Sequence, residues 1–222
     1  MKQTLKTSVV LSVLAAAALL AGCAALQKPE RPTLYDFGPP STAPLAATRE
    51  APLPPLALAD VDASGAFDSS ALLYRLGYAD ERQLQPYAHA RWTMPPAQLV
   101  RQRLRERLGQ RRAVLTPGEA AVALRVSGEE PLVLRLELEE FSQVFDAPGR
   151  SSGLVRLRAT LVALGIGGER LLAQRAFAVQ RPAATPDAPG GVRALAAATD
   201  AAADEIVAWL QQGQDRSQAQ AR

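Results

Sequence analysis

Hydrophobic and polar residues alternate most regularly in residues 132–138. Leucines occupy every second position there, and charged side chains fill most positions between them. Because successive side chains of a β-strand point to opposite faces of a sheet, the pattern predicts a strand with one face in the core and the other in water. The leucines are Leu132, Leu134, Leu136 and Leu138, and the charged residues between them are Arg135 and Glu137.

Other alternating or apolar runs predict strands at residues 56–61, 71–76, 83–91, 122–126, 154–164 and 170–180. The turn-forming residues Gly77, Ala79 and Asp80 favour a hairpin between the second and third of these strands. The glycine-rich segment 165–169 predicts a hairpin between the last two. It is not typical of a phosphate-binding loop, because it lacks the Lys-Ser/Thr ending and no helix follows it.

Two segments have the three-to-four-residue spacing of amphipathic helices. The first is 97–108, with the buried stripe Ala97, Val100, Leu104 and Leu108. The second begins at Val192 and places Leu195, Thr199, Ala202, Ile206 and Leu210 on one face. Two long helices and several strands indicate an α/β layer architecture.

Arginines border the stripe of the first helix on both sides, at Arg101, Arg103, Arg105 and Arg107. Together with Arg111 and Arg112 they are compatible with a patch for anionic lipid or nucleic acid. The interpretation we favour is that their aliphatic stems cover the edges of the core while their charged groups reach water.

The first 22 residues have the features of a secretory signal. Lys2 and Lys6 precede an almost unbroken apolar run at 9–21, which is too short to cross a hydrocarbon core of about 30 Å. The run ends in Leu-Ala-Gly-Cys, which resembles a bacterial lipobox with Cys23 as the first mature residue. This resemblance implies a diacylglycerol thioether and an N-acyl chain on Cys23, and Ala24 resembles an outer-membrane address.

The mature chain divides into three parts by composition. Residues 23–54 are rich in proline and predict an extended tether, which contains a short strand at 33–38. At about 3.1 Å per residue, a tether of roughly 30 residues would span about 90 Å. A single domain follows at 55–211, and the polar residues 212–222 predict a flexible tail.

The net charge and the counts of cysteine and histidine exclude several classes of function. The chain has 25 basic and 22 acidic residues, and its formal charge of +3 falls to about +1 once Lys2 and Lys6 leave with the signal. A near-neutral exported chain argues against a nucleic-acid partner. Cys23 is the only cysteine and His89 the only histidine, so an intrachain disulfide and the usual Cys/His metal sites are excluded.

Candidate catalytic groups are few. His89 lacks a nucleophile-elbow sequence, although a periplasmic hydrolase that uses it as a base is a third class of function to test. The adjacent Glu139 and Glu140 are expected on opposite faces of their strand, where they could not share one substrate. We therefore expect no enzyme activity, no catalytic residue and no bound metal.

The segment 71–108 resembles the ABC-type transport auxiliary lipoproteins, which work beside MCE-domain (mammalian cell entry) lipid transporters. The resemblance rests on Leu73-Tyr74-Arg75-Leu76-Gly77, on Leu84 and Tyr87, and on Trp92 with the leucines of the following helix. Tyr35-Asp36-Phe37-Gly38 is similar to the family's N-terminal signature. The insertion Gly128-Glu129-Glu130-Pro131 departs from the family pattern.

This resemblance implies a mixed β-sheet packed with amphipathic helices, in layers similar to anticodon-binding domains. It implies a non-catalytic lipoprotein that is anchored to the outer membrane, faces the periplasm, and docks to or completes an MCE-protein conduit. An ABC permease and ATPase would take part indirectly, no nucleic acid would bind, and assembly into homo-oligomers stays open.

Five residues are expected at the partner interface because exposed or half-exposed aromatic residues and arginine are common anchors there, and packing inside the fold is the alternative for each of them. They are Tyr35, Phe37, Tyr74, Arg75 and Trp92. The competing hypothesis is a stand-alone envelope lipoprotein that binds a small apolar ligand or peptidoglycan.

Overall fold

The computed structural model describes residues 31–39, 53–128 and 130–220. The chain separates into the units Met1–Pro32 and Thr33–Arg222, and all the elements described below belong to the second unit. The predicted signal at 1–22, the lipidated Cys23 and most of the predicted tether lie outside the described residues.

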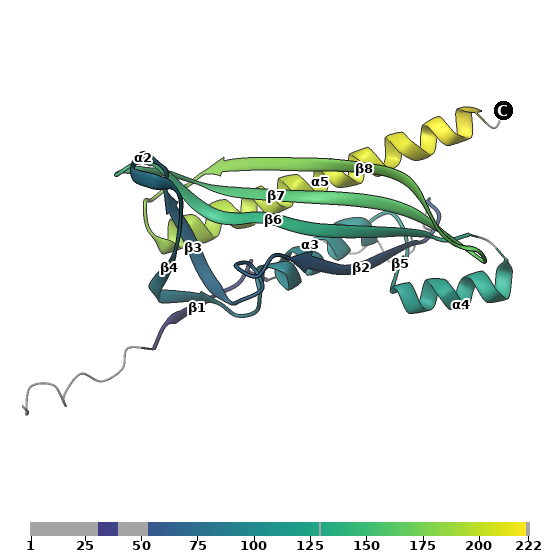
Figure 1. The fold of residues 1–222 in the computed structure, drawn as a ribbon, viewed down its shortest axis with the longest axis horizontal. Helices are drawn as coiled ribbons and strands as arrows, with labels where there is room; N and C mark the ends of the chain where they lie inside the picture. Colours follow the sequence, from purple (N-terminus) through teal and green to yellow (C-terminus); the bar gives the residue numbers. More distant parts are fainter. Residues whose placement is uncertain (1–30, 40–52, 129, 221–222) are drawn as a thin grey trace, which may run out of the picture. The chain divides into compact units, whose positions relative to one another are not determined.

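The described residues form eight strands and four helices (Figure 1). The strands are β1 (Thr33–Tyr35), β2 (Leu56–Ala63), β3 (Ala71–Leu76), β4 (Glu81–Trp92), β5 (Val114–Leu115), β6 (Leu132–Ala147), β7 (Arg150–Gly165) and β8 (Gly168–Pro182). The helices are α2 (Gly77–Asp80), α3 (Pro96–Gly109), α4 (Pro117–Ser127) and α5 (Ala188–Gln220).

All eight strands belong to one mixed sheet that branches at β6. One edge of β6 pairs with β7 along nearly its whole length, and β7 pairs in turn with β8. The other edge is shared, because β2 pairs with its first half and β3 with its second half. The β3–β4 hairpin and β1 extend the sheet beyond the second half, while β5 extends it beyond β2. The predicted α/β fold with a mixed sheet is confirmed.

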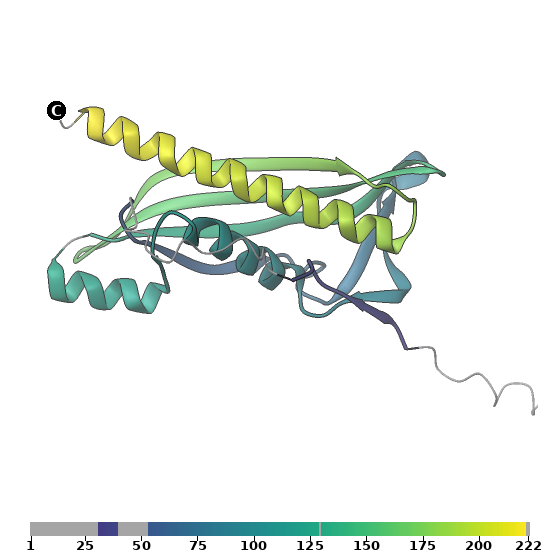
Figure 2. The ribbon, with the colours of Figure 1, turned by 180° about the vertical axis from the view of Figure 1, so that it is seen from behind.

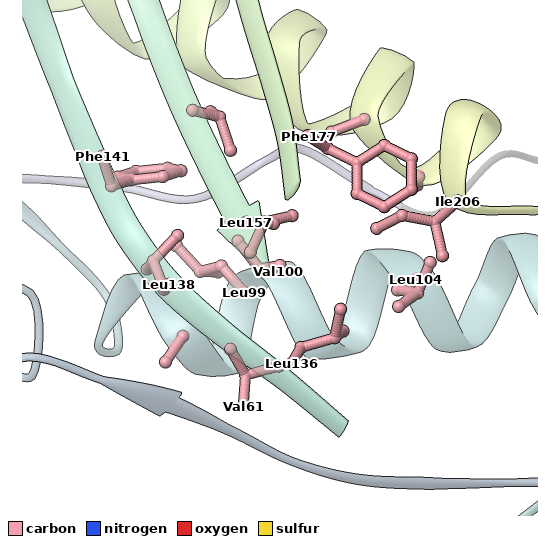
Figure 3. Close-up of a cluster of buried hydrophobic side chains, with 14 of the residues drawn as sticks. Val61, Leu99, Val100, Leu104, Leu136, Leu138, Phe141, Leu157, Phe177 and Ile206 are labelled. Carbon is pink, nitrogen blue, oxygen red and sulfur yellow. The ribbon is translucent and has the colours of Figure 1, made fainter. Parts of the chain in front are cut away.

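Helices α3 and α5 cover the same face of this sheet (Figure 2). The predicted stripes are buried: Val100 and Leu104 of α3 are each 1% exposed, and Leu195 and Ile206 of α5 are fully buried. Figure 3 shows α3, α5, β6 and β7 contributing side chains to one core. Burial of these aliphatic groups is the main force that holds the two helices on the sheet.

Helix α5 approaches the sheet closely at Gly153 of β7. A methyl group on Gly153 would lie 2.5 Å from the backbone nitrogen of Leu195, which is closer than real contacts allow. The absence of a side chain at this position therefore sets the distance between helix and sheet. The helix continues to Gln220, into the segment for which the sequence predicted a flexible tail.

The prediction of a strand at 122–126 is wrong, because this segment belongs to helix α4. Thr116 and Glu119 form a capping box at its start, Pro117 occupies the first turn, and Gly128 ends it with a left-handed φ of 73°. These are strong helix start and stop signals. They outweigh the alternation of Val122 and Val126, which are 50% and 83% exposed.

Helix α4 covers a small second core on the other face of the sheet. Val133 of β6 is 3% exposed, yet it is adjacent to Leu134 of the main core and so points to the opposite face. Ala57, Ala120 and Val162 pack around it. The predicted strand at 132–138 is confirmed, but both of its faces are covered at this end.

Candidate docking site

Arg75, one of the expected interface residues, is used inside the fold. Its Nε and Nη2 atoms donate to the two carboxylate oxygens of Glu140 at 3.3 and 2.9 Å, and its Nη1 donates to the backbone carbonyls of Glu81 and Arg82. The side chain is 20% exposed. Its main contacts therefore connect β3, the start of β4 and β6, and they leave little of it for a partner.

The expectation that Glu139 and Glu140 lie on opposite faces is wrong. The pairing of β6 with β7 shifts between Leu138 and Glu140, which is the mark of a β-bulge. Leu138 and Phe141 on either side of the pair are both buried in the main core. The bulge therefore places the two carboxylates together on the opposite face of the sheet.

Each carboxylate of this pair has its own arginine partners. Glu139 forms ion pairs with Arg156 and Arg158 of β7, whereas Glu140 is held by Arg75 and by the Ser142 hydroxyl at 2.6 Å. The pair is consequently a structural ion-pair network.

Tyr74 and Tyr87 pack ring against ring, and each donates a hydrogen bond to a glutamine. The Tyr74 hydroxyl donates to Gln85, and the Tyr74 ring lies 4.7 Å from that of Tyr87. The Tyr87 hydroxyl donates to the fully buried Gln143, whose amide nitrogen donates to the Ser151 hydroxyl. Burial, followed by the nearby Tyr74 and Asp187, raises the pKa of Tyr87 to about 12. These contacts give Tyr74 and Tyr87 a structural role.

Trp92 is 1% exposed, so the expectation of an accessible anchor is wrong for this residue. Its ring packs edge-on against Phe37 at 5.7 Å and Phe141 at 5.6 Å. Because Phe37 comes from the segment after β1, this cluster attaches that segment to the core. The predicted strand at 33–38 is present as β1, and it pairs in parallel with β4.

Tyr35, Phe37 and Tyr74 are half-buried, and of the five expected residues only Phe37 reaches the open surface beside α3. Phe37 lines a groove of about 440 Å³ between the β1 segment and α3. The groove is lined by Asp36, Phe37, Gly38, Pro39, Thr93, Met94, Leu99, Gln102, Arg103 and Glu106. This is the part of the fold where the predicted interface residues and an open surface coincide.

Arg103 closes one wall of this groove. Its Nη2 donates to the backbone carbonyl of Phe37 at 2.9 Å, its guanidinium lies 5.7 Å from the centre of the Phe37 ring, and its Nε pairs with Asp200 of α5 at 3.1 Å. Sequence reasoning treated Arg103 as one of several flanking arginines. A helical spacing cannot reveal this role, because the contact joins residues 66 positions apart.

The other arginines of α3 lie at the edges of the buried stripe, as the favoured interpretation predicted, whereas Arg112 after the helix is only 4% exposed and does not reach water in the same way. Arg101 pairs with Asp60 of β2, Arg107 pairs with Asp204 of α5, and Arg105 donates to the backbone carbonyl of Val114. Their charged groups border the buried stripe and join α3 to neighbouring elements. This arrangement does not present one continuous basic face.

The structure adds little that could support catalysis. His89 is exposed on β4. In the residues that the structure describes, no group of three or more His, Cys, Asp or Glu side chains could hold a metal ion. Within the same residues, no helix is long and apolar enough to cross a membrane.

A family model described as the ABC-type transport auxiliary lipoprotein component matches residues 35–207. The chain belongs to the ABC-type transport auxiliary lipoprotein family. The match begins at Tyr35 and reaches into α5, so it includes both the groove and the Leu73–Gly77 segment on which the resemblance was based. The resemblance is therefore confirmed, and the family is described as a transport component.

Solved structures support the same fold. A Xanthomonas campestris protein of the DUF330 family is 22% identical with a TM-score of 0.64, and the alignment covers 84% of this chain and 99% of that one. A second structure, of an uncharacterized protein, is 15% identical with a TM-score of 0.57, covering 82% of this chain and 99% of that one. At these identities the likeness shows the fold alone. No curated protein matches the sequence.

Proposed function

We propose that this protein is a non-catalytic auxiliary lipoprotein of an ABC/MCE-type system that moves lipids between membranes. The observation that carries the proposal is the family match over residues 35–207. Acyl chains on Cys23 would hold the protein at the periplasmic face of the outer membrane. Several chains together make such attachment stable, whereas a single chain binds only marginally.

In this proposal the folded unit docks to a periplasmic MCE-domain protein and helps to complete its conduit. The groove beside β1 supports this role, because Phe37 is an aromatic side chain at an open surface and is positioned by Arg103. The permease and the ATPase would act indirectly through the MCE protein. The chain would need no cofactor beyond its own lipid, and no nucleic acid would bind.

The neighbourhood of the gene gives an inexpensive first test. Adjacent reading frames for a permease, an ATPase and an MCE protein would support the transport role.

A genetic experiment tests the function directly. Deletion of this gene, deletion of the MCE gene and deletion of both should cause the same envelope defect, measured as sensitivity to detergents. A double deletion whose defect is the sum of the two single defects would place the proteins in separate processes.

The His89→Ala variant should restore a full envelope barrier to the deletion strain, whereas a periplasmic hydrolase that uses His89 as its base would lose activity.

A further inference from the structure

Exposed aliphatic side chains gather at one end of the sheet. Val122 and Val126 of α4, Ile166 at the tip of the β7–β8 hairpin, and Leu171 and Leu172 of β8 are between 40% and 95% exposed. We call these five residues the apolar end.

The elements that carry the apolar end are in contact with one another. Glu130, just after α4, pairs with Arg170 of β8 at 3.4 Å, and the backbone nitrogen of Leu164 donates to the carbonyl of Pro131. Figure 1 shows α4 beside the β7–β8 turn. The five side chains therefore belong to one region of the surface, and scattered single exposed residues would not need an explanation.

The apolar end is separate from the groove beside β1. It lies near Leu132, at the first residue of β6, whereas the pairing through β4 and β3 places β1 near Glu140. About eight strand residues separate these positions, which corresponds to roughly 26 Å. A partner could therefore engage the apolar end without covering the groove.

Strand β8 adds a free edge to this region. It runs for 15 residues and pairs only with β7 among the described strands. Residues 168–181 contain no proline, so the backbone groups along its outer edge can pair with an added strand. Recognition by strand addition combines such backbone bonds with contacts to alternate side chains.

Positive charge lies along the same strand. Arg170, Arg175 and Arg181 are all exposed on β8, and within the described part of the chain neither Arg175 nor Arg181 forms an ion pair. Arg125 of α4 is also exposed next to Val122 and Val126. A strand that carries carboxylates would complement these charges.

We propose that β8 and the apolar end form a strand-addition site for an extended segment of a partner protein that carries aliphatic and acidic side chains. The proposal rests on the proposed function, in which that partner is the MCE-domain protein. A second copy of this chain fits less well. Antiparallel pairing of two β8 strands brings their arginine-rich edges together, and like charges on facing strands are destabilising.

Site-specific photo-crosslinking in the full-length lipidated protein tests this proposal in intact envelopes. The probe p-benzoylphenylalanine replaces Leu171, which is 64% exposed, or Leu172, and in the control it replaces Tyr78 of α2, which is 48% exposed and lies at the other end of β6. The probes on β8 should crosslink to the MCE-domain protein, in a segment that mass spectrometry shows to contain aliphatic and acidic residues. The Tyr78 probe should not.

Charge reversal is the second arm of the experiment. Arg175→Glu should lower the crosslinking yield from Leu171 by about 10-fold, because it replaces an attraction by a repulsion, whereas the exposed Arg82→Glu should change it by less than about 2-fold. Copurification of the MCE protein with each variant is measured in parallel, so that loss of the β8 contact is separated from loss of the whole complex.

The outcomes separate the two proposals. Copurification of the MCE protein without a β8 crosslink overturns the strand-addition site and leaves the proposed function standing. The same conclusion follows if the crosslinking yield is unchanged by Arg175→Glu. A crosslink to a second copy or to phospholipid also overturns it. A crosslink to an acidic, aliphatic strand of a different identified envelope protein supports the site and overturns the MCE assignment. Absence of the MCE protein from every purification, together with absence of a β8 crosslink to any other protein, removes both.

Discussion

At the scale of single residues, Arg75 tests the structural role of the Leu73–Gly77 segment. We expect Arg75→Ala to lower the free energy of unfolding by about 1–3 kcal/mol, because Glu140 then loses both charge-assisted bonds at a site that is only 14% exposed. Arg75→Lys should recover part of this loss, since a lysine can donate to Glu140 but lacks the planar fork. Urea denaturation measures both effects.

The matched control for Arg75 is Arg150, which pairs with Asp146 at 2.7 Å but is 75% exposed. Arg150→Ala should change stability by less than about 0.5 kcal/mol, as is usual for surface ion pairs. Equal losses for the two variants would contradict the structural role assigned to Arg75.

Tyr87 makes a prediction about alkaline pH. Its pKa in the folded protein is raised from 10.0 to about 12, mainly by burial, so the neutral phenol is favoured in the folded state. The resulting stabilisation is complete below pH 10 and is lost as the pH rises from 10 towards 12. Ultraviolet titration should show a tyrosinate transition near pH 12 that is absent from Tyr87→Phe. Persistence of this late transition in Tyr87→Phe would show that it does not come from Tyr87 and would contradict the burial of the Tyr87 hydroxyl.

Acidic pH should affect the start of α5 through Asp187. Its carboxylate accepts from the Thr185 hydroxyl and the Gly190 backbone nitrogen, and these bonds hold the pKa of Asp187 below its usual value. A carboxyl group whose pKa is lowered by folding stabilises the folded state at pH values above its pKa in the unfolded chain. This stabilisation disappears as the pH falls through its pKa in the folded state. The melting temperature of Asp187→Asn should therefore depend less on pH in the acid range than that of the wild type.

Sequence reasoning identified residue types better than it identified their surroundings. Of the aromatic and arginine residues that it selected, Trp92 and Arg75 pack inside the fold, and only Phe37 lines the open groove. Local periodicity tells which face of an element a side chain occupies. It does not tell that Glu140 comes within hydrogen-bonding distance of Arg75, 65 residues away.

At the scale of elements, the contact between α5 and β7 depends on Gly153. Gly153→Ala should destabilise the protein by about 1–3 kcal/mol, because the added methyl group forces the helix backbone at Ala194 and Leu195 away from the sheet. Gly149 in the β6–β7 turn is the control, since a methyl group there meets no atom within 4 Å. Thermal denaturation should show a clearly lower melting temperature for the first variant only.

The strands and long helices were predictable because their hydrophobic periods agree with the final packing. The exceptions have identifiable physical causes. For α4, the capping signals at Thr116 and Gly128 decide the structure, whereas the alternation of Val122 and Val126 reflects no buried face. For the Glu139–Glu140 pair, a single bulge reverses the assignment of faces, and bulges leave no periodic signal.

At the scale of the whole molecule, β1 shortens the part of the predicted tether that can extend between Cys23 and the folded unit. Since β1 begins at Thr33 and pairs with β4, only the nine residues 24–32 connect Cys23 to the first strand of the fold. Their maximum reach is about 35 Å, well below the 90 Å estimated for the whole tether. If Cys23 is lipidated as proposed, this reach is the upper limit on the distance between the anchored cysteine and the start of β1.

The anchor itself is tested by Cys23→Ser. We expect this variant to fold, because Cys23 precedes every strand and helix of the second unit, but to fail to restore the envelope barrier of a deletion strain. Mass spectrometry of the wild-type protein should find the acyl chains on Cys23. Full activity of an exported, unlipidated Cys23→Ser protein would show that the anchor is dispensable.

The central claim is that this lipoprotein docks to an MCE-domain protein. The most direct measurement is purification of the Cys23-lipidated protein from detergent-solubilised envelopes, with quantitative mass spectrometry of the proteins that accompany it. We predict that an MCE-domain protein is enriched reproducibly over a mock purification. Repeated absence of any MCE-domain protein, with the lipoprotein itself recovered intact, would contradict the account.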